Sequence, residues 1–414
     1  MKRQLAYALM GISAVMLSTA CQNTKKSENS NQDTLKTTYE QGQFGFDLEF
    51  LQKYDSILIL SNESGLGQIL VSSKYQGKVF TSTADGPDGK SFGWVNYKAF
   101  NAPVDPHMNA YGGEDRLWLG PEGGPFSLYF ETEKEMVYEN WKTPAAIDTE
   151  EWNLLFATGN SVSMEKDTEL KNYKGTTLSI KLNRDIKMLS NTQIEADLGI
   201  NLNDKLKSVG FSTINTISNT GQEAWTKETG APCLWSLDMF MPTDSTVILV
   251  PYEENAKGKV ATTDYFGEIK KDRISYKNGV LYFKADGKSR GKLGLSPERA
   301  KNIAGSYDIE SGILTVTKFT IDPGKIYLNQ EWTTKKDPFL GDAVNAYNDG
   351  PLEDGSQMGP FYEIESVSPA AFLKPSEKLK HQHNVYHFLG DKEQVASLLK
   401  TLFNISVEDI KSAF

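Results

Sequence analysis

The chain has 414 residues, a formal net charge of −10 and a pI near 5.2. An acidic balance of this kind argues against nucleic acid as a partner, because phosphate binding needs a basic surface. After the N-terminal region, no segment approaches the apolar length of a transmembrane helix.

The first twenty residues are typical of a secretory signal peptide. Lys2 and Arg3 precede an apolar run over residues 5–17, which is too short for a spanning helix. Small residues at 18–20 then precede Cys21, a pattern that predicts bacterial lipoprotein processing, although Ser18 replaces the more usual leucine. Ordinary signal cleavage that leaves the cysteine behind is the alternative.

Lipidation of Cys21 would anchor the protein to the bilayer of the bacterial cell envelope, on the periplasmic or surface face of the outer membrane. Cys233 would then be the one cysteine left, which excludes an intramolecular disulfide. Stability must therefore come from a core, and the chain is long enough to form one.

Polar residues dominate 21–38, which we interpret as the lipidated cysteine and a flexible tether. Residues 39–54 contain an amphipathic stretch that predicts a helix over part of a sheet. From Ser56 onward, short apolar or alternating runs separated by Gly, Asn, Asp and Pro predict strands. These runs are 56–60, 68–73, 78–84, 127–132, 178–184, 212–218, 245–252, 280–286 and 313–321. So many strands indicate an all-β domain over 39–390, a large antiparallel sandwich or barrel.

Helical patterns are rare before residue 390. Ser296 followed by Pro297 predicts a first helical turn over 296–301. Apolar residues at helical spacing predict a pair of helices over 391–403 and 406–414, packed on the sandwich.

The stretch from His107 to Phe130 concentrates charged, aromatic and glycine residues. Leu117 and Leu119 alternate with Arg116 and Trp118, so a short strand would place the arginine and the tryptophan on one face. Such a face, together with the neighbouring carboxylates, suits a polyhydroxylated ligand. The candidate ligand-binding residues here are Asp115, Arg116, Trp118 and Glu122. A β-hairpin with an Arg–Asp ion pair and a core tryptophan is the alternative.

A second informative stretch covers residues 347–389. Glu363 and Glu365 are two apart in a predicted strand, so their carboxylates share one face. Like charges this close raise one pKa, which suits a general acid or base, although an exposed strand face would show the same spacing.

Three histidines follow at 381, 383 and 387. His381 and His383 share a strand face and would form either a metal-chelating pair or an exposed pair at a rim. His387 lies about 13 Å from His383 at strand rise, too far to join them. No third zinc ligand is evident, and the turns at 348–350 and 353–355 lack a full calcium-loop pattern, so we expect no metal or other cofactor.

The segment EIESVSPAAFLKPSEKLKHQHNVYHF, residues 363–388, resembles the C-terminal signature of aldose 1-epimerases, the galactose mutarotases. The resemblance implies a large β-supersandwich fold with a sugar-binding cleft. Glu365 matches the glutamate that takes the proton of the anomeric hydroxyl group. The segment from Asn109 to Arg116 resembles the sugar-binding segment, with Arg116 as the counterpart of the family's arginine. Residues 75–86, 91–97, 111–127 and 347–351 also resemble an uncharacterised family of bacterial lipoproteins in this superfamily.

The chain departs from the mutarotase pattern at the general acid. Thr220 stands where the family has a mid-chain histidine, and the following run to Trp235 has none. His107 would replace it only if its loop folded inward; otherwise it is a surface residue. Without a proton donor, ring opening would lose about 10²- to 10⁴-fold in rate.

Three functions fit these patterns. The first is a sugar-active enzyme, an aldose 1-epimerase-like isomerase with Glu365 as base. The second is a non-catalytic lipoprotein that binds mono- or oligosaccharides, with Trp118 or Trp235 stacking on a sugar ring. The third is a structural surface lipoprotein with a vestigial cleft.

Overall fold

Alternating apolar residues place most of the chain in antiparallel strands. The computed structural model describes residues 39–414, so the predicted signal peptide, Cys21 and the tether lie outside the described residues. Three sheets form in this part of the chain, with ten, five and three strands.

The largest sheet forms the middle layer. In order across it, the strands are β11 (Ile274–Lys277), β12 (Val280–Lys284), β10 (Thr246–Pro251), β14 (Ile303–Asp308), β15 (Ile313–Phe319), β18 (Lys378–Gly390), β8 (Leu206–Asn219), β7 (Thr177–Met188), β6 (Ser161–Lys171) and β5 (Asn153–Ala157).

The five-stranded sheet carries the candidate site. Its strands, again in spatial order, are β13 (Gly291–Leu295), β16 (Val344–Asn348), β17 (Tyr362–Val367), β9 (Cys233–Phe240) and β4 (Arg116–Gly120). The three-stranded sheet consists of β1 (Leu58–Ser61), β2 (Gln68–Ser72) and β3 (Lys78–Thr83).

Helices are short. They are α1 (Phe44–Leu51), α2 (Asn191–Leu198), α3 (Lys392–Phe403) and α4 (Val407–Lys411), with the 3-10 turns η1 (Ala99–Asn101), η2 (Tyr138–Asn140) and η3 (Ala145–Ile147). Within residues 39–414, no helix combines the length and the apolar character that crossing a bilayer requires.

The core lies between the ten-stranded and five-stranded sheets. Leu117, Ile364 and Val385 are fully buried there, each from a different strand. Burial of a side chain of this size stabilises the fold by about 1.5–3 kcal/mol. The predicted all-β antiparallel sandwich is therefore confirmed.

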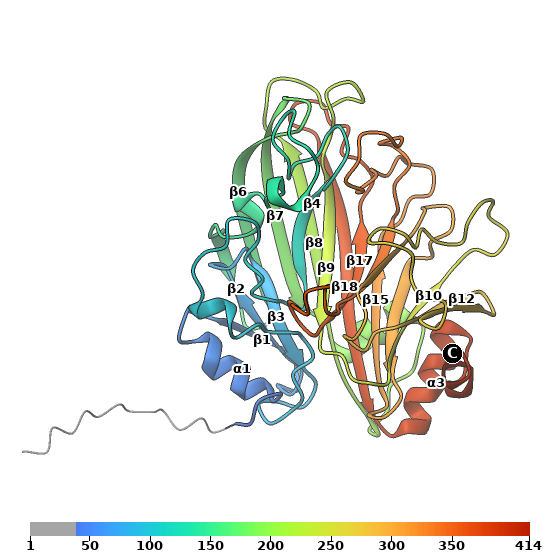
Figure 1. Cartoon of the computed structure of the whole chain (residues 1–414). Coiled ribbons are helices and arrows are strands. Elements are labelled where there is room, and N and C mark those ends of the chain that lie inside the picture. The colour runs from blue at the N-terminus through green and yellow to red at the C-terminus, as the bar shows by residue number, and fades with distance from the viewer. Residues whose placement is uncertain (1–38) are drawn as a thin grey trace, which may run out of the picture. The chain divides into compact units, whose positions relative to one another are not determined.

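The other face of the ten-stranded sheet is covered by the C-terminal helices. Tyr386 and Phe388 of β18 point toward Val395 and Leu399 of α3, because side chains alternate along a strand. The side chain of Asp391 caps α3 by accepting hydrogen bonds from the Glu393 and Gln394 amides. Figure 1 shows α3 in red against this sheet and α1 in blue beside β1–β3. The predicted C-terminal helix pair and the helix within 39–54 are thus confirmed.

Two predicted elements are absent from the structure. Residues 127–132 do not form a strand, because the Leu128 amide bonds back to the Pro121 carbonyl and the Ser127 carbonyl accepts from Tyr173. Their apolar character has another cause: Tyr129 and Phe130 fill the core from a folded loop.

Residues 296–301 form one turn, not a helix. The Arg299 and Ala300 amides bond to the Ser296 carbonyl, but Ala300 then pairs with Tyr252 in an extended bridge. The guanidinium of Arg299 donates to surrounding loop carbonyls and fixes the turn.

Helix α2 has no counterpart among the predicted elements. Only Ile194 of its residues is buried, so it lacks a hydrophobic stripe. The detectable signal is local: Ser190 and Gln193 form a capping box, and Gly199 ends the helix in a left-handed conformation.

Candidate functional site

One face of the five-stranded sheet points away from the core and holds most of the predicted site residues. Arg116 pairs across to Leu237 in β9, and Leu237 pairs with Glu365 in β17. Trp118 lies opposite Trp235 in the same way. Since side chains alternate, these residues share the outer face, while Leu117 and Ile364 turn inward to the core.

Two buried ion pairs lie on this face. The Arg116 Nη2 atom is 2.5 Å from Glu363 Oε1, and Lys292 Nζ in β13 is 3.0 Å from Glu365 Oε2. The predicted strand over Arg116–Leu119 and the shared face of Glu363 and Glu365 are confirmed. Residues that are 247 positions apart in the chain, Arg116 and Glu363, are therefore in direct contact.

Aromatic rings surround the charged groups. The Arg116 guanidinium lies 5.3 Å from the Trp118 ring, and Lys292 Nζ lies 4.6 Å from the Trp235 ring. The two indoles meet edge to face at 5.8 Å. Trp235 also donates from Nε1 to Glu365 Oε2 at 2.9 Å. The cations are thus fixed by both a carboxylate and a ring.

Burial changes the acidity of the carboxyl groups here. It raises the pKa of Glu363 to about 7, against the opposing attraction of Arg116. Burial also raises the pKa of Glu122, which Lys292 opposes. Glu363 is therefore able to hold or release a proton near neutral pH.

Some buried polar atoms at this site have no protein partner within residues 39–414. Glu365 Oε1 and Arg116 Nε are both in this state. A buried carboxylate oxygen or guanidinium nitrogen without a partner costs free energy, so both atoms are available to a ligand or to water.

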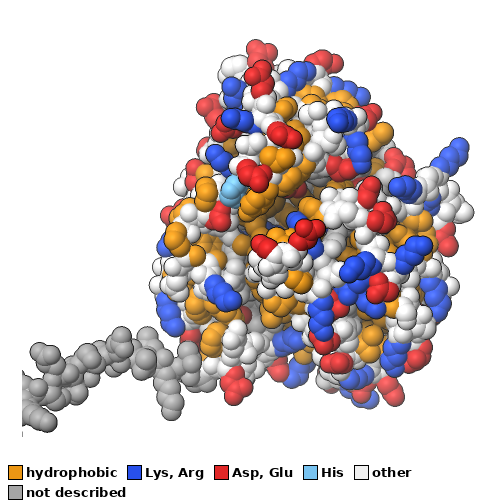
Figure 2. Space-filling model, in the orientation of Figure 1, with side chains coloured by type: hydrophobic (Ala, Val, Ile, Leu, Met, Phe, Trp, Pro, Cys, Tyr) orange, Lys and Arg blue, Asp and Glu red, His pale blue; other side chains and the backbone are white. Residues whose placement is uncertain are grey.

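The sheet face forms the floor of a cavity of about 320 Å³. Arg116, Trp118, Trp235 and Glu363 line it from the strands. The opposite wall comes from loops that carry Glu122, Tyr138, Trp141, Phe266, Arg290 and Trp332. In Figure 2 the surface is hollowed over the region where Figure 1 labels β9 and β17, with hydrophobic and charged side chains around the hollow. We call this cavity the inner cavity.

Glu365 lies beneath the inner cavity and does not line it. Its side chain is fully buried under Lys292 and Trp235. Access to its free oxygen therefore depends on those two side chains.

Asp115 does not lie on the predicted face, which corrects the sequence interpretation. Its carboxylate points into the core, 2.8 Å from Arg184 Nη2 and within hydrogen-bonding distance of Thr213 Oγ1. Strand alternation turns it away from its neighbour Arg116. Its role is to join β4 to the ten-stranded sheet, as an ion pair with Arg184 rather than with Arg116.

Asn109 and His107 also lie outside the cavity lining. Asn109 Nδ2 donates to Asp148 at 2.9 Å and orders the loop before β4. The His107 Nδ1 atom is 2.6 Å from the Trp141 carbonyl, and its ring stacks on Tyr138 at 4.6 Å. The structure therefore does not place Asn109 on the ligand-binding face, and the loop of His107 does not carry its ring into the cavity lining.

The three C-terminal histidines are buried between the sheets, not exposed at a rim. Ser366 Oγ is 2.7 Å from both His381 Nε2 and His383 Nδ1, and His383 Nε2 is 2.7 Å from Asp238 Oδ2. They face the inward side of β17, opposite Glu365. No histidine from this group therefore reaches the inner cavity.

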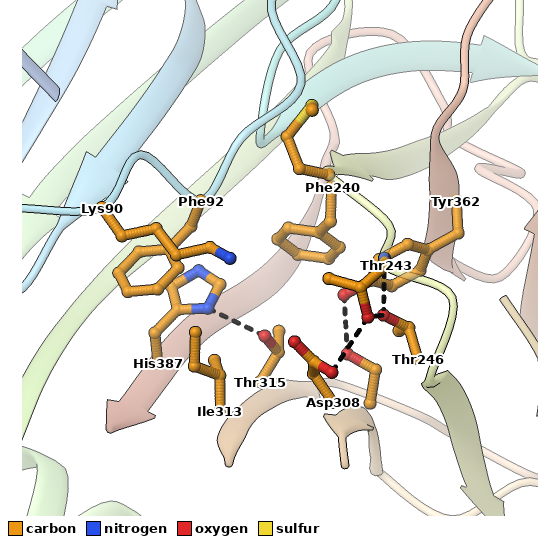
Figure 3. A pocket seen from close by; sticks show the side chains of 12 residues that line it. Lys90, Phe92, Phe240, Thr243, Thr246, Asp308, Ile313, Thr315, Tyr362 and His387 are labelled. Atoms are coloured by element: carbon orange, nitrogen blue, oxygen red, sulfur yellow. Dashed lines mark hydrogen bonds between the residues drawn. The ribbon is translucent and has the colours of Figure 1, made fainter. Parts of the chain in front are cut away.

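His387 lies beside a separate small cavity of about 20 Å³, shown in Figure 3, which has room for about one water molecule. Its Nδ1 atom is 2.9 Å from Thr315 Oγ1, and its ring stacks on Phe92. All three histidines are engaged in hydrogen bonds. In the described part of the chain, no three His, Cys, Asp or Glu side chains gather as a metal site.

The turns considered for calcium are held by their own side chains. Asn348 Oδ1 accepts from the Gly287 amide, and Asp349 Oδ2 accepts from the Gly359 amide. Asp354 Oδ1 likewise accepts from Ser356. These are turn-forming contacts.

Sequence reasoning missed Lys292, Arg290 and Phe266. Lys292 is the one charged residue in Gly291–Leu295, where Leu293 and Leu295 alternate toward the core. That alternation is a detectable signal that the Lys292 side chain lies on the face of the strand that points away from the core. Arg290 and Phe266 lie in loops, and no sequence pattern predicts that they meet, 3.9 Å apart.

The fold and the site together define an all-β sandwich protein with a charged, aromatic cleft on its smaller sheet. The chain belongs to DUF6786, a family of unknown function, whose model matches residues 42–414. Comparison with curated proteins gives no significant match.

Solved structures with a similar chain path include three bacterial proteins. A galactose mutarotase-like protein from Lactobacillus casei has 11% identity and a TM-score of 0.47, over 80% of this chain and 100% of its own. A galactose mutarotase related enzyme from Lactobacillus acidophilus has 9% identity and a TM-score of 0.43, over 81% and 98%. The Slr1438 protein from Synechocystis has 10% identity and a TM-score of 0.47, over 81% and 96%.

Proposed function

We propose that the cleft binds carbohydrate. The observation that carries the proposal is the convergence of Trp118 and Trp235 with Arg116, Lys292 and Glu363 on one sheet face. Indole faces suit the apolar C–H faces of a sugar ring, and guanidinium, ammonium and carboxylate groups suit its hydroxyls. Arg116 is ion-paired with Glu363 and Lys292 with Glu365, which favours a neutral ligand.

A second candidate function is proton transfer at the anomeric carbon, with Glu365 as base. Glu365 Oε2 accepts from Trp235 and Lys292, and its Oε1 has no protein partner within residues 39–414. These contacts hold the carboxylate in place and leave its second oxygen free to take a proton.

The reaction would be an anomer interconversion. Glu365 would remove the proton of the anomeric hydroxyl, the bond between that carbon and the ring oxygen would break, and the ring oxygen would receive a proton. Glu363 and Glu122 are the candidate donors, because burial raises the pKa of each. Ring closure on the other carbonyl face would return both protons. Because Glu365 is buried beneath the inner cavity, binding remains the primary proposal.

The test is a titration of the purified protein with mono- and oligosaccharides, followed by tryptophan fluorescence. NMR would then measure anomer interconversion for any sugar that binds. We expect Arg116→Ala to weaken binding at least tenfold. Turnover that Glu365→Gln abolishes would establish catalysis, and binding without turnover would leave a sugar-binding protein. If no sugar binds, carbohydrate is the wrong ligand class.

We further propose that Cys21 carries a lipid that anchors the protein to the cell envelope. The support is the sequence pattern of residues 2–21. Cys21→Ser is expected to move the protein from the membrane fraction to the soluble fraction of cells that express it. Mass spectrometry of the N-terminal peptide would detect the lipid, and an unmodified Cys21 would contradict the proposal.

A further inference from the structure

The cleft extends well beyond the inner cavity. A second cavity of about 510 Å³, the outer cavity, shares Glu122, Lys292, Trp332 and Tyr347 with the inner one, so the two are continuous. Each volume alone reaches the range of roughly 300–1,000 Å³ that is usual for a small-molecule site. The joined space is therefore longer than a single sugar ring requires.

Exposed apolar side chains gather at the mouth of the outer cavity. Tyr138 is 56% exposed, Phe266 43%, Leu352 47% and Met358 44%, and all four line the outer cavity. Large apolar side chains that cluster on a surface mark interaction sites more often than singly scattered ones do.

Two aromatic rings of the outer cavity, those of Phe266 and Trp332, are held in place by neighbouring side chains. The Arg290 guanidinium stacks 3.9 Å from the Phe266 ring centroid and donates from Nε to Tyr347 Oη at 3.2 Å. Trp332 stacks on Trp141 at 5.9 Å. Rings fixed in this way lose little conformational entropy on binding, which suits them as stacking platforms.

The charges at the outer cavity are of both signs. Arg290 and Lys292 line it together with Glu122, Glu331 and Asp349, so the wall carries no excess of positive charge. A chain of uronates or phosphates would meet repulsion from these carboxylates. A neutral, polyhydroxylated chain would meet donors, acceptors and rings.

We infer that the cleft binds a neutral oligosaccharide, with one unit in the inner cavity on Trp118 and Trp235. The following units pass Phe266 and Trp332, which line both cavities, and occupy the outer cavity beside Leu352. This inference rests on the proposed carbohydrate-binding function and specifies its ligand class.

The test compares sugars of one to four units from neutral gluco-, galacto-, manno- and xylo-oligosaccharide series, with oligogalacturonates as the acidic series. We expect affinity to rise at least tenfold from the monosaccharide to the trisaccharide of the series that binds. Leu352→Ala, at a residue that lines the outer cavity and not the inner one, is expected to remove part of that gain and to leave the monosaccharide affinity unchanged. Leu66→Ala, at an exposed leucine that lines neither cavity, is the matched control and should change neither value.

Each other outcome has a distinct meaning. If a monosaccharide binds as tightly as its trisaccharide, or if Leu352→Ala weakens both equally, the extended site is wrong while the proposed function stands. Tighter binding of the acidic series would overturn the neutral ligand class. Absence of binding for every sugar would overturn both proposals.

Discussion

At the scale of single residues, the site depends on buried charges that neutralise each other. Lys292 is 7% exposed and Glu365 is fully buried, so neither charge is well solvated. Burying an ion is costly unless its partner and its hydrogen bonds are in place. Trp235 donates a second hydrogen bond to the same oxygen of Glu365, Oε2. These residues therefore form one unit in which each member fixes the others.

The first prediction concerns this pair. Lys292→Met leaves Glu365 buried without its cation, and we expect it to lower the free energy of unfolding by about 3–5 kcal/mol. The double variant Lys292→Met, Glu365→Gln should recover most of that loss, because no charge is then stranded. Urea denaturation measures both values.

Lys336→Met is the matched control. It breaks an ion pair with Glu331 in which the lysine side chain is 49% exposed, so we expect a loss under about 1 kcal/mol. Equal losses for the buried and the exposed lysine would contradict the account of the site.

At the scale of elements, the C-terminal helices complete a core that the sheet alone leaves open. Val395, Leu398 and Leu399 recur at helical spacing in α3 and are buried against β15 and β18. Without α3, the apolar side chains of Tyr386 and Phe388 would be exposed to solvent. The helix is therefore part of the domain and not an appendage.

Leu399→Ala tests the contribution of this helix. We expect the free energy of unfolding to fall by about 2–5 kcal/mol, because the truncation removes buried methyl groups and leaves a cavity. Ser397→Ala, on the exposed side of the same helix, should stay within about 0.5 kcal/mol of the parent protein. Thermal or urea denaturation distinguishes the two, and similar small effects would mean that α3 contributes little.

At the scale of the whole molecule, polar groups join the two large sheets through the core. Arg184 of β7 binds Asp115 beside β4, and His383 of β18 binds Asp238 of β9. Ser366 of β17 adds a second link to His383. Because each of these groups is buried, a missing partner costs more than in water, and the sheets are held in one relative position.

The His383–Asp238 pair predicts a pH dependence of stability. Burial raises the pKa of Asp238 from 3.8 to about 7, although His383 opposes the shift. The folded protein thus holds a proton that the unfolded carboxylate releases above about pH 4. Asp238 therefore stabilises the fold at low pH, and this contribution is lost as the pH rises toward 7. Burial lowers the pKa of His383, but the neighbouring Asp238 carboxylate outweighs it, so the pKa of His383 is raised. This raised pKa also makes the stability fall as the pH rises.

The measurement compares the parent protein with Asp238→Asn by urea denaturation at about pH 4.5 and about pH 7.5. The stability of the parent relative to the variant should fall as the pH rises. Asp272→Asn, at an exposed loop carboxylate, is the control for global charge and should show no such change. A pH-independent difference for Asp238→Asn would show that folding does not raise the pKa of Asp238 as described.

The sequence by itself determined the elements with a clear period. The alternation in Arg116–Leu119 and the two-residue spacing of Glu363 and Glu365 decided which faces these side chains occupy, because a strand has a fixed period of two. The same holds for α3, whose apolar positions follow a helical period. Both periods are local properties of the sequence, so they can be read without knowing the tertiary structure.

Only the tertiary structure decided what each face meets. Alternation placed His381 and His383 together, but only the packing of β17 on β18 shows that they are buried beside Ser366 and not exposed. Asp115 next to Arg116 looks like an ion pair, yet the strand turns them to opposite sides. Lys292 reaches Glu365 from 73 residues away. Such contacts depend on strand order and register, which are set by the whole core and not by any local segment.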